Sequence, residues 1–229
     1  MKWTDDFISL IFPRICACCG NSLWKHEEVI CHFCEFHLPK TNFHPDPENP
    51  VSMLFWGRAN IEAGTAYLWF NKGNSVQRLV HQLKYKGRKD IGIHLGRQYG
   101  SLLRNTVPFN TIQAIIPVPL HKKKYMQRGY NQSEQFAIGL AKAMKVPVSR
   151  FLLYRTRATE TQTRKSRFNR YRNVSEIFAV SHPDNFTGMH LLLVDDVITT
   201  GATLEACIQA LFVIPGVKIS VACIATAML

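Results

Sequence analysis

The sequence predicts an α/β fold: a central, mostly parallel sheet flanked by helices, with a small metal-binding region at the N-terminus. Three observations predict this class. Short apolar runs alternate with helix-length amphipathic segments over most of the 229 residues. The run Leu191–Val194 ends at two adjacent carboxylates, and ligands of open α/β sheets bind at the carboxyl ends of strands. Two Cys-x-x-Cys pairs lie close together near the N-terminus.

Composition limits the class of protein. Hydrophobic residues make up 46% of the chain, which is enough for a substantial core. No apolar run approaches the ~20 residues of a membrane-spanning helix, and the N-terminus lacks a signal-peptide pattern. The seven cysteines are odd in number and clustered, which favours a reducing compartment over a disulfide scaffold. We therefore expect a cytoplasmic protein without a membrane span.

Positive charge is concentrated in two segments. The formal net charge is +12, and residues 72–104 hold eight Lys and Arg against one Asp. Residues 121–172 hold fourteen Lys and Arg against two Glu. This concentration predicts an anionic partner, either the phosphates of a small ligand or a nucleic-acid backbone. The alternative is a solvated basic face without a specific partner.

The N-terminal cysteines have the spacing of a tetrahedral metal site. Two Cys-x-x-Cys pairs are separated by eleven residues, and thiolates in this pattern bind a structural Zn²⁺. The four ligands would be Cys16, Cys19, Cys31 and Cys34. Cys18, His32 and His37 are spare potential ligands, and a set of reduced, unligated cysteines is the alternative. A closed site of four thiolates leaves no position for substrate, so its role would be structural or partner-binding.

The first half of the chain then continues with an arm and four elements. Residues 38–50 carry four prolines and indicate a linker or extended arm, so we divide the chain into 1–45 and 46–229. Residues 55–58 and 63–70 predict a pair of strands. Residues 75–85 and 91–103 predict helices, because apolar side chains recur there at helical spacing.

The second half predicts alternating strands and helices with one irregular excursion. A strand over 112–116 ends at Pro117-Val118-Pro119, which makes a stiff loop with few backbone donors. A helix over 133–144 follows, and then the polar, basic segment 153–179, whose length and charge are typical of a lid. The strand 191–194, a helix over 204–212 and a strand over 217–226 complete the pattern.

The stretch after Val194 carries the chemistry. Asp195 and Asp196 are suited to sugar hydroxyls or to a hard cation such as Mg²⁺. A glycine-bearing turn that opens a helix offers backbone N–H groups to a phosphate, and threonine hydroxyls add donors. That turn comprises Thr199, Thr200, Gly201, Ala202 and Thr203. A phosphate site beside a diol site indicates a ribose phosphate. The alternative is an ordinary strand–helix turn with a polar cap.

These thirteen positions, Leu191 to Thr203, resemble the signature of type I phosphoribosyltransferases. The resemblance implies that Asp195 and Asp196 hold the ribose hydroxyls of phosphoribosyl pyrophosphate, bound with Mg²⁺, and that residues 199–203 cradle its 5′-phosphate. The basic segment resembles the flexible loop that closes over pyrophosphate in that family. Arg164 and Lys165 would be its tip residues, acting in catalysis together with the two aspartates.

A narrower resemblance covers nearly the whole chain. The order of the cysteine pairs, Pro117-Val118-Pro119, Arg128-Gly-Tyr-Asn-Gln132, Arg170-Tyr-Arg-Asn-Val174 and the acidic stretch is similar to that of the ComF/GntX family. Members are competence-type proteins with a zinc finger fused to a phosphoribosyltransferase domain. The resemblance implies that Pro117, Val118 and Pro119 form the loop on the pyrophosphate side. It further implies a role in DNA uptake, with single-stranded DNA and competence or recombination proteins as partners.

Two functions from different classes remain open. As a binding protein, the chain would contact single-stranded DNA, with bases stacked on aromatic residues near the basic segments. The candidates for stacking are Tyr85, Tyr130, Phe168 and Tyr171, for which core packing is the alternative. As an active phosphoribosyltransferase, it would transfer ribose 5-phosphate to an unidentified nitrogen acceptor. The family's usual hood for the base, often completed beyond the last strand, has no counterpart there, so the N-terminal half would have to supply it.

Overall fold

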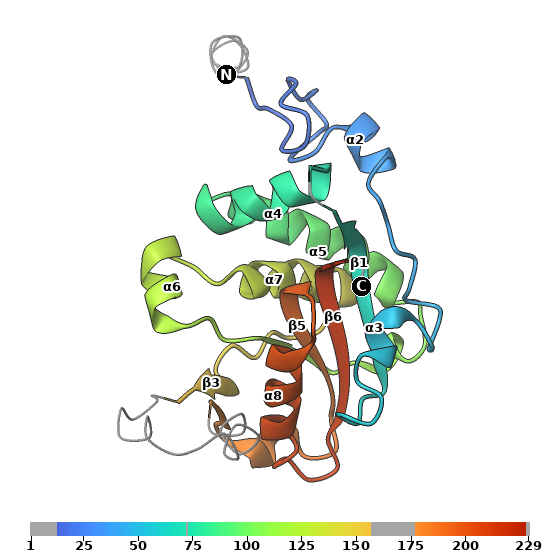
Figure 1. The fold of residues 1–229 in the computed structure, drawn as a ribbon, viewed down its shortest axis with the longest axis vertical. Coiled ribbons are helices and arrows are strands. Elements are labelled where there is room, and N and C mark those ends of the chain that lie inside the picture. The colour runs from blue at the N-terminus through green and yellow to red at the C-terminus, as the bar shows by residue number, and fades with distance from the viewer. Residues whose placement is uncertain (1–12, 72, 157–176, 228–229) are drawn as a thin grey trace.

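A computed structural model describes residues 13–71, 73–156 and 177–227. Its centre is a four-stranded sheet in the order β1 (Ala63–Phe70), β6 (Lys218–Ala227), β5 (His190–Ile198), β2 (Ala114–Pro117). All three neighbouring pairs are parallel. Figure 1 shows β5 and β6 side by side in the middle of the molecule. The predicted α/β class with a mostly parallel sheet is confirmed.

Strand β5 is buried on both faces of the sheet. Leu192 and Val194 belong to one hydrophobic cluster, and Leu191 and Leu193 belong to another. Since successive strand side chains point to opposite faces, this four-residue apolar run supplies both cores at once. A strand buried in this way has its carboxyl end fixed on both sides, which gives the following residues a rigid base.

Three helices cover one face of the sheet: α4 (Ser75–Tyr85), α5 (Lys89–Leu103) and α7 (Gln132–Met144). The helices predicted over 75–85, 91–103 and 133–144 therefore form, with boundaries shifted by two residues or fewer. Helices α5 and α7 cross closely, because a Cβ atom added to Gly96 would lie 2.3 Å from the carbonyl oxygen of Phe136. A Cβ atom added to Gly139 would lie 2.2 Å from that of Ile93.

The opposite face is covered by α8 (Ala202–Leu211) and by the short helix α3 (Pro50–Met53). Figure 1 shows α8 in front of the sheet and α5 and α7 behind it. A two-stranded antiparallel ladder of β3 (Leu153–Arg155) and β4 (Phe178–Val180) lies beyond the β2 side. The remaining elements are α6 (Lys122–Arg128) and the 3₁₀ turns η1 (Phe109–Thr111) and η4 (Pro183–Phe186).

Residues 55–58 do not form the predicted strand. They are turns that follow α3, with Phe55 buried and Trp56 exposed. Helix α3 begins after Asn49, whose side chain accepts from the backbone N–H groups of Val51 and Ser52. The proline-rich arm takes the position beside β1 instead, through an antiparallel bridge between Lys40 and Leu68. The arm, and not residues 55–58, therefore covers this edge of the sheet.

The cysteine region lies at one end of the molecule, against α4 and α5. It contains the short helix α2 (His32–Phe36) and an antiparallel bridge between Ile15 and Ser22. Ala17 and Ile30 share a hydrophobic cluster with α4 and α5, and Gln82 Nε2 donates to the carbonyl of Ala17 at 2.6 Å. A boundary at 45/46 stays a prediction.

Within the ranges 13–71, 73–156 and 177–227, no helix is both long and apolar enough to span a membrane.

Candidate functional site

The acidic pair lies at the carboxyl end of β5, which extends through both aspartates to Ile198. Asp195 Oδ1 accepts from the hydroxyl of Ser133 on α7 at 2.8 Å and from the backbone N–H of Asp196 at 2.8 Å. Burial and the neighbouring Asp196 carboxylate together raise the pKa of Asp195 to about 7, against the two hydrogen bonds and Lys84. A carboxyl group with such a pKa changes its charge near neutral pH.

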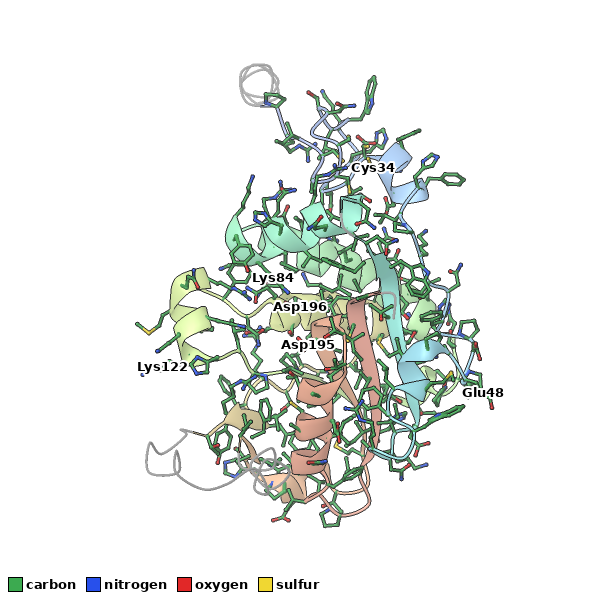
Figure 2. All side chains as sticks on the ribbon, in the orientation of Figure 1. Cys34, Glu48, Lys84, Lys122, Asp195 and Asp196 are labelled. Atoms are coloured by element: carbon green, nitrogen blue, oxygen red, sulfur yellow. The ribbon has the colours of Figure 1, made fainter. Side chains whose placement is uncertain are left out.

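Asp196 has a cationic partner that the sequence did not reveal. Lys84 Nζ, near the end of α4, lies 3.0 Å from Asp196 Oδ1, and both side chains are largely buried. Figure 2 shows Lys84 above the two aspartates, between α4 and the end of β5. In the sequence, Lys84 is marked only by its position next to the apolar Leu83, near the end of an amphipathic helix, and this position does not predict a carboxylate partner. The ion pair holds Asp196 beside Asp195 at a site where two like charges repel.

The threonine loop opens helix α8 as predicted. Gly201 is the N-cap residue and has φ +75°, a left-handed conformation that favours glycine. Gly201 has no side chain to cap the helix, so the N–H groups of its first turn are free of a side-chain cap. Thr199, Thr200, Ala202 and Thr203 are exposed around Gly201. The loop therefore offers an anion backbone donors and hydroxyls from one side.

Two residues of the turn at 55–58 contact the threonine loop and hold it in place. The ring of Phe55 is within 3.5 Å of the position of a Cβ atom on Gly201, which places it directly under the loop. Arg58 donates to the carbonyl of Thr200 at 2.9 Å and also pairs with Glu205 in the first turn of α8. Arg58 thus neutralises a carboxylate near the loop. Both contacts come from the turn that residues 55–58 form in place of the predicted strand.

The Pro117-Val118-Pro119 loop is brought next to the acidic pair. Pro117 is in register with Val194 on β5, and the N–H of Val118 donates to the carbonyl of Val194 at 2.9 Å. The carbonyl of Val118 accepts from Asn131, whose side chain also caps α7 and so helps to place Ser133. The parallel pairing of β2 and β5 is the reason that two motifs distant in sequence meet at one edge.

The four predicted metal ligands converge. The Sγ atoms of Cys16, Cys19, Cys31 and Cys34 all lie within 4.8 Å of one another. The Sγ atoms of Cys19 and Cys31 are 3.8 Å apart, and a tetrahedral site with Zn–S bonds of about 2.3 Å has sulfur–sulfur edges of about 3.8 Å. These residues therefore fit a structural metal.

The cluster also distinguishes Cys16 from Cys18. Burial raises the pKa of Cys16, but the backbone N–H groups of Cys19, Cys31 and Cys18 outweigh it and bring the pKa to about 7. Burial raises the pKa of Cys18 to about 12, and Cys18 is outside the cluster. A thiolate that accepts backbone hydrogen bonds suits a metal ligand, and a buried protonated thiol suits the core.

The remaining predicted site residues differ in their exposure, and some lie outside the part of the chain that the structure describes. Tyr130 is 5% exposed, its hydroxyl donates to the carbonyl of Leu83, and Lys89 lies over its ring, so it packs in the core instead of stacking bases. Tyr85 is exposed, with the guanidinium of Arg128 over its ring. Arg164, Lys165, Phe168 and Tyr171 lie outside the described residues.

The fold and the edge of the sheet define a class: a phosphoribosyltransferase-type α/β domain with a cysteine cluster near its N-terminus. Residues 131–228 match the phosphoribosyl transferase domain family. The solved structure of adenine phosphoribosyltransferase from Leishmania tarentolae is similar to this chain. The match covers 79% of this chain and 89% of that one, at 12% identity and a TM-score of 0.39.

Relatives with known names identify the family within this class. The chain is 33% identical over 203 residues to DNA utilization protein YhgH of Escherichia coli O157:H7, covering 86% of this chain and 83% of that protein. It is 34% identical to Competence protein F of Haemophilus influenzae, covering 56% and 57%, and 25% identical to Competence protein ComFC of Bacillus subtilis, covering 85% and 70%. The chain belongs to the ComF family.

Proposed function

We propose that this protein binds phosphoribosyl pyrophosphate with Mg²⁺ and acts in DNA uptake during natural transformation. One observation carries the proposal: a carboxylate pair and a glycine-opened anion loop occur together at the carboxyl edge of the sheet. Sugar hydroxyls would donate to Asp195 and Asp196, while the N–H groups and hydroxyls of residues 199–203 would hold the 5′-phosphate. The bound Mg²⁺ would neutralise charge on the pyrophosphate.

The surrounding residues support this assignment. Pro117, Val118 and Pro119 are fixed against β5, which would give the pyrophosphate side of the ligand a rigid wall. Arg164 and Lys165 remain candidates for the residues that close over it. Lys84 occupies the position beside Asp196, so it would have to release that carboxylate or share it with a ribose hydroxyl. We also propose Zn²⁺ as the metal of the four cysteines, with a structural role.

The DNA role rests on two observations. Relatives that cover most of the chain are named for DNA utilization and competence. Positive charge is concentrated in residues 72–104 and 121–172, as expected for a chain that meets nucleic-acid phosphates. Single-stranded DNA in the cytoplasm is the partner we propose, with competence or recombination proteins as further partners.

An active phosphoribosyltransferase is the second candidate. The pKa of Asp195, raised to about 7, favours it, because acids and bases of active sites are often poised near the working pH. The protein would then transfer ribose 5-phosphate to a nitrogen acceptor and release pyrophosphate. We propose that Tyr85, whose ring lies under the guanidinium of Arg128 at the end of α4, faces the acceptor base.

Calorimetry of phosphoribosyl pyrophosphate with Mg²⁺ tests the ligand. The natural protein should bind, and the variant Asp195→Asn/Asp196→Asn should lose at least about a hundredfold in affinity, since both ribose contacts lose their charge. The variant Asp46→Asn/Asp184→Asn removes the same charge at exposed positions and should bind normally. No binding by the metal-loaded natural protein would contradict the proposal.

Pyrophosphate release separates the two candidates. The natural protein, loaded with ligand and Mg²⁺, would be offered a panel of nucleobases and other nitrogen acceptors. Release that depends on an acceptor and disappears in the double aspartate variant would establish the enzyme. Binding without release for every acceptor in the panel would favour the binding protein.

A further inference from the structure

A groove separates helix α6 from the β3 strand, on the side of the molecule away from the cysteine region. Its volume is about 690 Å³. In Figure 1 the labels α6 and β3 mark its two sides. It is lined by aromatic and basic side chains, among them Lys122, Tyr125, Arg150, Phe151, Tyr154 and Arg155. None of these residues belongs to the acidic pair or to the threonine loop.

Three aromatic side chains of the groove are open to solvent. Phe151 is 84% exposed, Tyr125 is 50% exposed and Tyr154 is 47% exposed. They come from both sides: Tyr125 from α6, and Phe151 and Tyr154 from the segment that leads into and forms β3. Large aromatic rings exposed together, between cations, are unusual on a protein surface that has no partner. Each ring offers a flat face on which a base could stack whatever its identity.

The cations in and beside the groove differ in their contacts. Arg155 donates to the carbonyl of Pro119 at 2.8 Å and lies over the ring of Phe178, so it shapes the floor. Arg150 pairs with Glu134 at 3.0 Å. Lys122, Lys123 and Lys124 are all exposed on α6, and Figure 2 shows Lys122 at the outer edge of the molecule.

Helix α6 is itself unusual. None of its residues is buried, so no apolar face ties it to the core. Its first three residues are lysines, although cations are unfavourable at the positive end of a helix. An anionic partner along the helix would offset both features, since it would screen the lysines and cover the exposed residues.

We propose that this groove is the surface on which the protein binds single-stranded DNA. Unpaired bases would stack on Tyr125, Phe151 and Tyr154, and the phosphates would follow the lysines of α6. The inference rests on the proposed contact with single-stranded DNA. It assigns base stacking to rings other than the four candidates from the sequence, of which Tyr130 is buried. Pro119 borders the groove, so the strand would pass beside the loop proposed to hold the pyrophosphate side of the other ligand.

The test uses the full chain with its metal and a fluorescent dT oligonucleotide, with affinity measured by anisotropy at several salt concentrations. The variant Phe151→Ala/Tyr154→Ala should bind at least tenfold more weakly, because two stacking platforms are removed. The variant Lys122→Gln/Lys123→Gln/Lys124→Gln should lower the slope of log affinity against log salt by about 2. Both variants should bind phosphoribosyl pyrophosphate as the natural protein does.

Matched controls and competitors complete the design. Trp56→Ala removes a ring that is 57% exposed on another part of the surface, and Lys142→Gln/Lys145→Gln/Lys218→Gln removes three lysines elsewhere. Neither control should weaken oligonucleotide binding to the same extent. A duplex of the same length should compete poorly because its bases are already stacked, and an equal affinity for duplex would overturn the proposal. A ribo-oligonucleotide that binds much more tightly than dT would identify RNA as the ligand and likewise overturn it.

Failure of the groove and failure of the proposed function have different signatures. If the natural protein binds dT but both groove variants bind equally well, DNA contacts another surface and only the groove is refuted. If no oligonucleotide binds while phosphoribosyl pyrophosphate does, the DNA contact is refuted as well. If the small ligand alone fails to bind, the groove stands and the assignment of the acidic site falls.

Discussion

The cysteine cluster and the acidic site are both small groups of polar side chains, but the chain assembles them in opposite ways. All four cysteines lie between positions 16 and 34, so two local turns suffice to bring their sulfur atoms together. The acidic site joins Ser133 to Asp195, 62 residues away, and Arg58 to Thr200, 142 residues away. A local cluster can be recognised from spacing, whereas a site built from distant segments exists only once the sheet has formed.

The two sites also differ in electrostatics. Backbone N–H groups bring the pKa of Cys16 down to about 7, which prepares a thiolate for a cation. Burial and a second carboxylate raise the pKa of Asp195 to about 7, so this group holds its proton more tightly than an ordinary aspartic acid. A metal would therefore stabilise the first site. At the second site, Ser133 and Lys84 favour the Asp195 carboxylate, but burial and Asp196 outweigh them, so ionisation of Asp195 costs folding free energy.

Loss of the metal should have the largest effect. Cys34→Ser should abolish metal binding and lower the thermal midpoint by more than about 10 °C, because structural zinc contributes several kcal/mol and the cysteine region shares its hydrophobic cluster with α4 and α5. Metal content by mass spectrometry and unfolding by circular dichroism would measure both. Cys18→Ala is the matched control and should retain the metal; a Cys34→Ser protein with unchanged metal content would show that the cluster is not the site.

The next largest effect should be the pH dependence that Asp195 imposes. Its folded pKa, about 7, lies above its ordinary value of 3.8, so its contribution to stability is fully present below pH ~4 and is lost as the pH rises through about 7. From pH 5 to pH 8, Asp195→Asn should become more stable relative to the natural protein by up to about 3 kcal/mol. Urea unfolding at each pH measures this difference, and the exposed Asp184→Asn should show no such trend.

Gly201 provides a smaller and more selective effect. Gly201→Ala should lower stability by about 1 kcal/mol, because φ +75° is strained for alanine. It should also weaken binding of phosphoribosyl pyrophosphate, since the loop would relax away from its conformation. Gly216→Ala, at φ +67° in the turn before β6, carries the same backbone penalty without touching the loop. Calorimetry that finds equal affinity in the two variants would argue against a phosphate at Gly201.

The smallest effect should come from Lys84. Lys84→Met should lower stability by about 1 kcal/mol, because a largely buried Asp196 loses its partner. The pKa of Asp195 should rise further, since the charge of Lys84 lowers it in the natural protein. Carboxyl chemical shifts followed by NMR across a pH titration would measure the change. Lys86→Met, two residues further on and exposed, is the control; equal titration curves for both variants would refute the coupling.

Much of this protein can be predicted from its sequence where the determinants are local. Helix α4 forms over the predicted residues because Asn74 caps it and four apolar side chains recur at helical spacing. The sulfur atoms of the four predicted cysteines converge because Cys-x-x-Cys spacing imposes its own geometry. The loop at Gly201 joins β5 to α8 as predicted, because a strand, two acids and a glycine turn are consecutive in the chain. Residues 55–58 form turns and not the predicted strand, because a short apolar run is equally compatible with a turn that buries only Phe55. Helix α3 and the arm decide between the two.

The sequence by itself determined the alternation of strands and helices, the convergence of the four N-terminal cysteines and the order of polar residues at the end of β5. Each depends on interactions within a few residues of the chain. Only the tertiary structure decided that Lys84 pairs with Asp196, that Arg58 and Phe55 support the threonine loop, and that Tyr130 is buried while Phe151 is exposed. The physical reason is that burial and pairing depend on which segments become neighbours in the folded sheet. Parallel pairing joins segments that are far apart in sequence, so local sequence patterns do not reveal those neighbours.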